Sequence, residues 1–339
     1  MNRITWIDYY KAISILLVVI SHSHCFNFLY LWTCSFIMQA FFFESGFWLK
    51  SSGSISVREL ASEVHRKFKR LMVPCYLWAI IFASFSIPSL TRIIYGSYPM
   101  LKAAHSYASP LWFLPVLFIT IVLFFFCRFI FQKSFSIPIK LCTACCAFLV
   151  AGFLPKVEIG YPFGINVSIA AFGFLLMGNI CFPYLQQIRR FLDGKENKLK
   201  ICLLLVGTVV LGVGSYLLCR LNSQYVDHVL MGNAQYGNYW LFLIVSPIGI
   251  LFTIALAFLL DLLPQGPIHS CMNYIGQNTF LNYVLNKPII AGVKSVLEII
   301  PVSIFIEQII IIIAVLMVSC AVNELIKRYA PVLLGLYRQ

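Results

Sequence analysis

The residues near the N-terminus that could do chemistry are one carboxylate, one ammonium group and one imidazole within an apolar stretch. They are Asp8, Lys11 and His22 in IDYYKAISILLVVISHS. On a helix, Lys11 and His22 share a face about 16 Å apart along the axis, and Asp8 can pair with Lys11 one turn away. A neutral imidazole can take a proton from a hydroxyl group. The pattern favours general-base catalysis by His22, with a histidine that serves only helix packing as the alternative.

A second histidine and a buried carboxylate extend this polar set. His24 points to a different side of the helix from His22, and we interpret it as an interfacial neighbour. Glu44 lies in the apolar stretch FIMQAFFFESGFWLK, where a carboxylate needs a partner. Two interpretations of Glu44 stay open. It forms a structural ion pair with Lys11 or another helix, or it lines the same cavity and helps to tune or orient the reacting groups.

A run of basic residues follows, in RELASEVHRKFKRLMVP. On a helix, Arg66 and Arg70 share a face because they are four residues apart, and Lys67 is next to Arg66. The preference of membrane proteins for cytoplasmic positive charge explains such a run without further function. A pair of arginines at the mouth of a helical bundle also suits the phosphate groups of a nucleotide-like ligand.

The elements that must position these residues are membrane-spanning helices. The chain has 339 residues, of which 60% are hydrophobic and 11% are charged, and its mean hydropathy is +0.88. Soluble proteins average about 25% charged residues, and apolar blocks of about 20 residues recur here, as in helices that cross a bilayer. We predict an all-α polytopic membrane protein, a single membrane domain over residues 1–339. The expected spans are approximately 7–27, 33–50, 73–95, 110–128, 139–155, 165–183, 201–220, 239–260, 273–293 and 303–326.

The charges indicate topology and argue against a nucleic-acid partner, although the net charge is +13. With the N-terminus in the cytoplasm, 18 of the 25 basic residues fall on the inner side of these spans and six on the outer side. Such a bias predicts that both termini are cytoplasmic. We expect the 12 cysteines to be mostly small, buried apolar side chains, including the group CTACC at Cys142–Cys146, and we expect no metal site.

Five stretches stand in a recognisable order along most of the chain: IDYYKAISILLVVISHS, FIMQAFFFESGF, RKFKRLMVPCYLW, SPLWFLPVLF and IGQNTFLNYVLNKPI. Together they resemble the acyltransferase-3 family of integral membrane O-acyltransferases, in its sugar and polysaccharide O-acetyltransferase branch. The basic residue, ten intervening residues and the histidine fit the family's opening, with Lys11 in place of the commoner arginine. Asn286 occupies the place of a late histidine, which puts any role of that histidine in doubt.

The resemblance implies transfer of an acyl group, usually the acetyl group of cytoplasmic acetyl-CoA, to a hydroxyl of a cell-surface or lipid-linked glycan. Acetyl-CoA is then a substrate, and no bound cofactor is expected. The phosphates of the donor would meet Arg66, Lys67 and Arg70, while His22 acts as general base or as an acyl relay. Candidate acceptor or cavity residues are Ser45, Trp112 and Asn286. The expected location is a bacterial cytoplasmic membrane, among its lipids.

Two other functions are compatible with the residues. A transporter or flippase of lipid-linked glycans would use the polar line of the first span as a path for protons or substrate. It explains the basic run only as a topology signal. A non-catalytic membrane component of glycan assembly is the third possibility.

Overall fold

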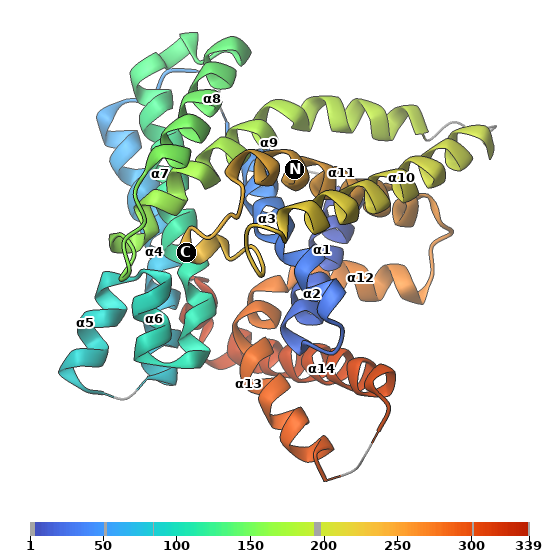
Figure 1. Cartoon of the computed structure of the whole chain (residues 1–339). Helices are drawn as coiled ribbons and strands as arrows, with labels where there is room; N and C mark the ends of the chain where they lie inside the picture. Colours follow the sequence, from blue (N-terminus) through green and yellow to red (C-terminus); the bar gives the residue numbers. More distant parts are fainter. Residues whose placement is uncertain (1–3, 51–52, 84, 193–197, 300–301, 338–339) are drawn as a thin grey trace. The chain divides into compact units, whose positions relative to one another are not determined.

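The computed structural model describes residues 4–50, 53–83, 85–192, 198–299 and 302–337 (Figure 1). The fold is 83% helix, and the described residues hold no strand, only an isolated bridge between Leu230 and Gln235. The predicted all-α class is confirmed. Three of the basic residues used in the charge count, Arg3, Lys195 and Arg338, lie outside the described residues.

The chain forms two compact units. Unit 1 comprises the described residues of Met1–Phe41, Pro183–Leu230 and Gln235–Glu324, and unit 2 those of Phe42–Phe182, Met231–Ala234 and Leu325–Gln339. The helices that lie in unit 1 are α1 (Thr5–Ser23), α2 (Asn27–Cys34), α10 (Lys198–Asn222), α11 (Tyr239–Leu262), α12 (Pro267–Gln277) and α13 (Thr279–Leu297). Those of unit 2 are α4 (Val57–Phe82), α5 (Ile87–Tyr95), α6 (Tyr98–Ala104), α7 (Phe113–Phe131) and α8 (Ile137–Phe153), with 3₁₀ turns η1 (Gly46–Trp48) and η2 (Ser106–Trp112). Three helices have residues in both units: α3 (Ile37–Ser45), α9 (Ile165–Leu192) and α14 (Ile304–Tyr329).

Helix α1 is the centre of unit 1 and packs against α2, α11, α12 and α13. A Cβ at Gly276 would lie 1.9 Å from the carbonyl oxygen of Asp8, so only glycine allows α12 to approach α1 so closely. Farther along α1, Val19 joins a buried apolar cluster with Ile290 of α13 and Ile311 of α14. These contacts place α13 beside the end of α1 that carries His22.

Within unit 1, a buried ion pair joins α1, α11 and the last turns of α9 near the start of α1. The Arg189 guanidinium of α9 lies 2.6 Å from a carboxylate oxygen of Asp261 on α11, and the two side chains are 11% and 8% exposed. The hydroxyl of Thr5 donates to the other carboxylate oxygen at 2.6 Å. The pair therefore fixes the first turn of α1 against α9 and α11.

In unit 2, α4 begins at a capping box. The Ser56 hydroxyl accepts from the Glu59 backbone N–H, and the Glu59 carboxylate accepts from the Ser56 backbone N–H at 2.8 Å. This reciprocal pair satisfies two backbone donors that a helix start leaves open. The apolar part of α4 then packs against α7 and η2.

The segment from Phe42 to Lys50 is held tightly against α9 within unit 2. A Cβ at Gly178 would lie 1.8 Å from the carbonyl oxygen of Phe43, and one at Gly46 would lie 2.1 Å from that of Leu175. Both glycines are therefore required by close backbone contact. The consequence is a fixed position for η1 and for the side chains that it presents.

Within the described part of the chain, five helical segments are long and apolar enough to cross a membrane: Ser106–Ser134, Pro162–Leu192, Lys198–Asn222, Tyr239–Leu262 and Ile304–Tyr329. They coincide with five of the expected spans, and the shorter apolar helix α8 coincides with a sixth. The remaining expected spans differ from the structure. The segment 33–50 is divided between α2, α3 and η1, and 273–293 between α12 and α13. Likewise 7–27 ends as a helix at Ser23, and 73–95 is divided between α4 and α5.

The expectation that the cysteines of CTACC are buried is wrong, because Cys142, Cys145 and Cys146 are exposed on α8. The buried residues of α8 are instead Lys140, Ala144, Ala147 and Ala151, which recur at helical spacing. The small alanines let α8 pack closely through that side, and the cysteines lie on the outward side.

Candidate functional site

The three polar residues of the predicted line all lie on one continuous helix, α1. The Lys11 ammonium is 3.8 Å from an Asp8 carboxylate oxygen, and the Asp8 side chain is 7% exposed. His22 lies in the last turn of α1 and is half-buried. An ion pair at one end and an imidazole at the other are thus arranged along a helix that is otherwise mostly buried.

The imidazole of His22 lies beside α13. Lys287 of α13 is within electrostatic range of it, and Asn286 is fully buried. The Asn286 amide N–H donates to the Tyr283 carbonyl oxygen at 2.9 Å, while its Oδ1 has no hydrogen-bond partner among the described residues. Asn286 is one turn before Ile290, which packs against Val19 of α1, so it faces the same neighbour.

Other buried polar groups of this region were missed by the sequence reasoning. Asn282 has an unpartnered Oδ1 within the described part of the chain, and the Ser23 hydroxyl lies 2.6 Å from Oε1 of Gln308. The signal that could have found Asn282 is its spacing from Asn286, four residues along the same helix. The side-chain N–H groups of both residues bond carbonyl oxygens of the chain, so their unpartnered Oδ1 atoms are the acceptors that a hydroxyl-bearing ligand can bond.

His24 is outside helix α1 and takes part in a cluster of three tilted rings. It has a left-handed backbone conformation with φ 53° and is exposed. Its ring centre lies 4.4 Å from that of Tyr30, which lies 5.0 Å from that of His228. Burial lowers the pKa of His228, with the nearby Asp227 acting in the opposite direction. The ring cluster gives His24 a packing role apart from the polar line of α1.

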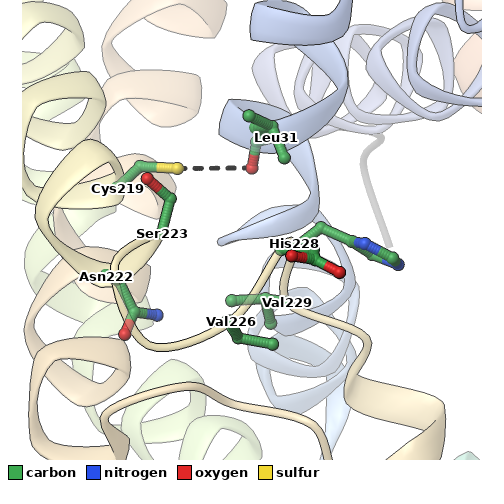
Figure 2. Close-up of a pocket in the computed structure, with 8 residues that line it drawn as sticks. Leu31, Cys219, Asn222, Ser223, Val226, His228 and Val229 are labelled. Atoms are coloured by element: carbon green, nitrogen blue, oxygen red, sulfur yellow. Dashed lines mark hydrogen bonds between the residues drawn. The ribbon is translucent and has the colours of Figure 1, made fainter.

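A small pocket lies between α2, the end of α10 and the loop that contains His228 (Figure 2). The Cys219 thiol points at the Leu31 carbonyl oxygen across it at 3.3 Å, and the His228 ring extends away from Cys219. Its volume is about 10 Å³, which is room for one water molecule. This pocket is too small for a sugar or a nucleotide.

In unit 2, Glu44 has a partner on its own segment. Its carboxylate accepts a hydrogen bond from the Trp48 indole N–H at 2.8 Å, and the residue is 8% exposed. The neighbouring Ser45 is half-buried. The Glu44–Trp48 bond spans one helical turn, so Glu44 fixes the orientation of the indole.

A basic cavity of about 330 Å³ lies next to that indole. Its lining comes from three stretches of unit 2: Trp48, Leu49, Lys50, Glu63, Arg66, Lys67, Phe125 and Arg128. Arg66 forms an ion pair with Glu63. Two of the three predicted donor-binding residues, Arg66 and Lys67, are therefore in one cavity. Arg70 is exposed one turn farther along α4 and does not line it.

The pKa of Lys67 is lowered, first by burial and then by Arg70 and Arg66. A cation so placed gains from an incoming anion, because the anion stabilises the charged form. Lys50 and Arg128 add two further positive groups that the sequence reasoning counted only as topology signals. A set of four cations with one carboxylate is suited to a polyanionic ligand.

Trp112 is a packing residue in unit 2. It is 5% exposed, its ring centre lies 6.5 Å from that of Phe42, and a Cβ at Gly232 would lie 2.7 Å from the indole. The backbone of Gly232 thus covers the ring, which leaves little surface for a sugar to stack on.

The predicted residues are divided between the two units. Unit 1 holds Asp8, Lys11, His22 and Asn286, and unit 2 holds Glu44, Ser45, Arg66, Lys67, Arg70 and Trp112. The structure brings Lys11 to Asp8, and Arg66 to Lys67 in the basic cavity.

A family model described as an acyltransferase domain, that of the acyltransferase-3 family, matches residues 4–324. Comparison with curated proteins and with solved structures found no match. The matched region includes every candidate residue of both units.

Proposed function

Because this chain belongs to the acyltransferase-3 family, we propose that it is a membrane O-acetyltransferase. It moves an acetyl group from cytoplasmic acetyl-CoA to a hydroxyl of a cell-surface or lipid-linked glycan. The observation that carries the proposal is the polar line of α1, with the Asp8–Lys11 pair near one end and His22 in the last turn. Helix α13, which packs against that end of α1, carries the buried Asn286.

The donor end of the reaction uses the basic cavity of unit 2. The diphosphate and 3′-phosphate of CoA are anions that bind arginine and lysine through charge-assisted hydrogen bonds. Arg66 and Lys67 line that cavity with Lys50 and Arg128, which supports this part of the proposal. Arg70 contributes at longer range through its positive charge.

The chemical step is an acyl transfer. The neutral imidazole of His22 accepts the proton of the acceptor hydroxyl, whose oxygen attacks the thioester carbonyl. The new C–O ester bond forms as the C–S bond breaks, and the departing thiolate of CoA takes up the proton from the imidazolium. In the relay variant, the imidazole nitrogen attacks the thioester first, and the C–N bond forms as the C–S bond breaks and the CoA thiolate leaves. The hydroxyl oxygen then attacks the acetyl group, the C–O bond forms as the C–N bond breaks, and the hydroxyl proton passes to the thiolate.

Asp8 and Lys11 tune this path instead of reacting. Asp8 and Lys11 form an ion pair near the start of α1, at the opposite end from His22. Glu44 acts on its own segment, where it orients Trp48. On the acceptor side, the free oxygen of Asn286 can accept a hydrogen bond from a sugar hydroxyl.

The protein crosses a bacterial cytoplasmic membrane about ten times with both termini in the cytoplasm. The shorter and interrupted helices, such as α2, α3, α12 and α13, would complete crossings inside the protein, where irregular backbone is tolerated. Helices α10 and α14 leave most of their apolar side chains exposed, which suits contact with lipid.

The test of the proposal is transfer of radiolabelled acetyl groups from acetyl-CoA to membrane glycolipid by the purified protein. We expect His22→Ala to abolish transfer while the protein still inserts and folds. His24→Ala is the matched control and should keep most of the activity, because His24 stands apart from the polar line.

If His22→Ala transfers acetyl groups at the wild-type rate, the assignment of His22 as the base is overturned. Movement of glycolipid across vesicles without incorporation of label would instead support a transporter.

A further inference from the structure

The basic cavity has an aromatic wall as well as positive charge. Trp48 is 44% exposed and lines the cavity together with Lys50, Arg66, Lys67 and Arg128. The single carboxylate of the lining, Glu63, is already paired with Arg66. Phosphate groups explain the cations, but they give no reason for a large exposed indole beside them.

The indole of Trp48 is held in place before any ligand arrives. Its N–H donates to Glu44 at 2.8 Å, and its ring centre lies 6.1 Å from that of Phe182 at an interplanar angle of 48°. Glu44 is thus a buried carboxylate, in an apolar segment, that bonds one exposed indole, and carboxylates are seldom buried in proteins. The arrangement fixes the aromatic surface, which lowers the entropy cost of binding a ligand to it.

The backbone around Trp48 is fixed by a second set of contacts. The Asn179 side-chain amide donates to the carbonyl oxygens of Gly46 at 2.9 Å and Leu49 at 2.7 Å. Asn179 in turn accepts from the ammonium group of Lys140 at 2.9 Å, and Lys140 is 6% exposed. A buried lysine thus supports the turn that carries Trp48, and the wall of the cavity is rigid.

We propose that Trp48 stacks the base of a phosphorylated nucleoside whose phosphates bind the four cations of the same cavity. Aromatic side chains stack nucleic-acid bases through their π-faces, and this is worth a measurable part of the affinity. The cavity volume of about 330 Å³ is within the range of ligand sites, roughly 300–1,000 Å³.

The inference rests on the proposed function, which makes the ligand an acyl donor. It adds which chemical class of acyl donor the cavity binds. A thioester carried on free CoA has an adenine base and a 3′-phosphate. A thioester carried on a carrier protein has a single phosphodiester and no base. Trp48 therefore selects the nucleotide-bearing donor, and Glu44 is a positioning residue that acts through Trp48.

The experiment measures binding of adenosine 3′,5′-bisphosphate and of 4′-phosphopantetheine to the purified full-length protein in detergent. The bisphosphate should bind the wild type and quench the fluorescence of Trp48. The Trp48 signal is the part of the fluorescence that the wild type has and Trp48→Phe lacks. We expect Trp48→Ala to weaken bisphosphate binding by about 5- to 100-fold and to leave phosphopantetheine binding nearly unchanged. Trp240→Ala is the control, because Trp240 is also exposed, at 55%, but lies in unit 1.

The role of Glu44 is tested by two further variants. Glu44→Gln keeps an oxygen that accepts from the indole and should bind the bisphosphate within about 3-fold of wild type. Glu44→Ala frees the indole and should weaken binding more than Glu44→Gln does.

Equal bisphosphate affinity in wild type, Trp48→Phe and Trp48→Ala would overturn the proposal. An unchanged KM for acetyl-CoA in Trp48→Ala with normal transfer would also overturn it, while the proposed acetyltransferase would stand. Trp48-dependent bisphosphate binding without any acetyl transfer by the wild type would instead overturn the proposed reaction and support the nucleotide site.

Discussion

At the scale of single residues, His22 and His24 differ because a helix ends between them. Their spacing already separates the two side chains around a helix axis, and that much could be predicted from the sequence. The left-handed turn at His24 and its ring contact with Tyr30 could not be predicted, because they depend on where α2 and the loop at His228 pack. The Glu44–Trp48 bond spans four residues, a spacing that is visible in the sequence but does not by itself show that the two side chains bond.

Asn286 allows a residue-scale test that separates function from stability. Replacing it with leucine removes a buried oxygen that has no partner among the described residues, and it also removes the bond to Tyr283. Removing the unsatisfied buried oxygen of Asn286 is stabilising, and this offsets much of the stability that is lost with the bond to Tyr283. We therefore expect the melting temperature of Asn286→Leu to stay close to wild type and its acetyl transfer to fall at least 10-fold.

The matched control for this variant is Asn323→Leu. Asn323 donates to Asn278 at 3.0 Å, so its loss leaves a partner unsatisfied and should lower the melting temperature more than Asn286→Leu does. Unchanged transfer by a folded Asn286→Leu would remove Asn286 from the acceptor site.

Lys67 predicts how donor binding depends on pH. Its pKa in the free protein is lowered by burial and by the two arginines, and donor phosphates favour its charged form. The KM for acetyl-CoA should therefore rise as the pH rises through this lowered pKa, where the ammonium loses its proton. Lys67→Arg stays charged and should keep a constant KM over the same range. If the KM for acetyl-CoA depends on pH in the same way in the wild type and in Lys67→Arg, this role of Lys67 is contradicted.

At the scale of elements, the long apolar helices were predictable and the interrupted ones were not. Continuous hydrophobicity marks α7, α9, α10, α11 and α14, because a helix that crosses the hydrocarbon layer in one piece needs about 20 consecutive apolar residues. A stretch made of two or more short helices held inside the protein has no such requirement. The segments 33–50 and 273–293 therefore break into shorter helices, and their hydrophobicity gives no sign of where they break.

The Arg189–Asp261 pair makes an element-scale prediction. Arg189→Ala leaves the 8%-exposed carboxylate of Asp261 without its cation, which typically costs about 3–5 kcal/mol. The melting temperature in detergent should fall accordingly. The exposed neighbour Arg190 is the control, since Arg190→Ala should change stability by no more than about 0.5 kcal/mol. Equal melting temperatures for the two variants would show that the pair does not join α9 and α11.

At the scale of the whole molecule, the candidate residues are shared between two units. The sequence order placed them on helices, but it did not predict the basic cavity. That cavity combines side chains near residues 48–50, 63–67 and 125–128, and their meeting depends on how α4 and α7 pack. Arg128 and Lys50 were therefore interpreted only as topology signals.

The charge bias predicts the orientation of the whole chain. A fluorescent protein fused after Gln339 should fluoresce, and alkaline phosphatase fused there should be inactive, because both reporters would be cytoplasmic. A phosphatase fusion that ends at Ser223, in an expected outer loop, is the control and should be active. Active phosphatase at the C-terminus would contradict the predicted topology.

Helix α8 has 17 residues, which is about 26 Å of helix, shorter than the ~30 Å hydrocarbon layer of a typical bilayer. As one of the proposed crossings, so short a helix would favour locally thin bilayers, at a cost of fractions of a kcal/mol per Å of mismatch. The same helix carries Lys140, which bonds Asn179 and through it the turn at Gly46 and Leu49. If α8 crosses the membrane as proposed, we expect the chain length of the surrounding lipids to act through Lys140 and Asn179 on the wall of the basic cavity. Membrane thickness should then alter the binding of the proposed donor.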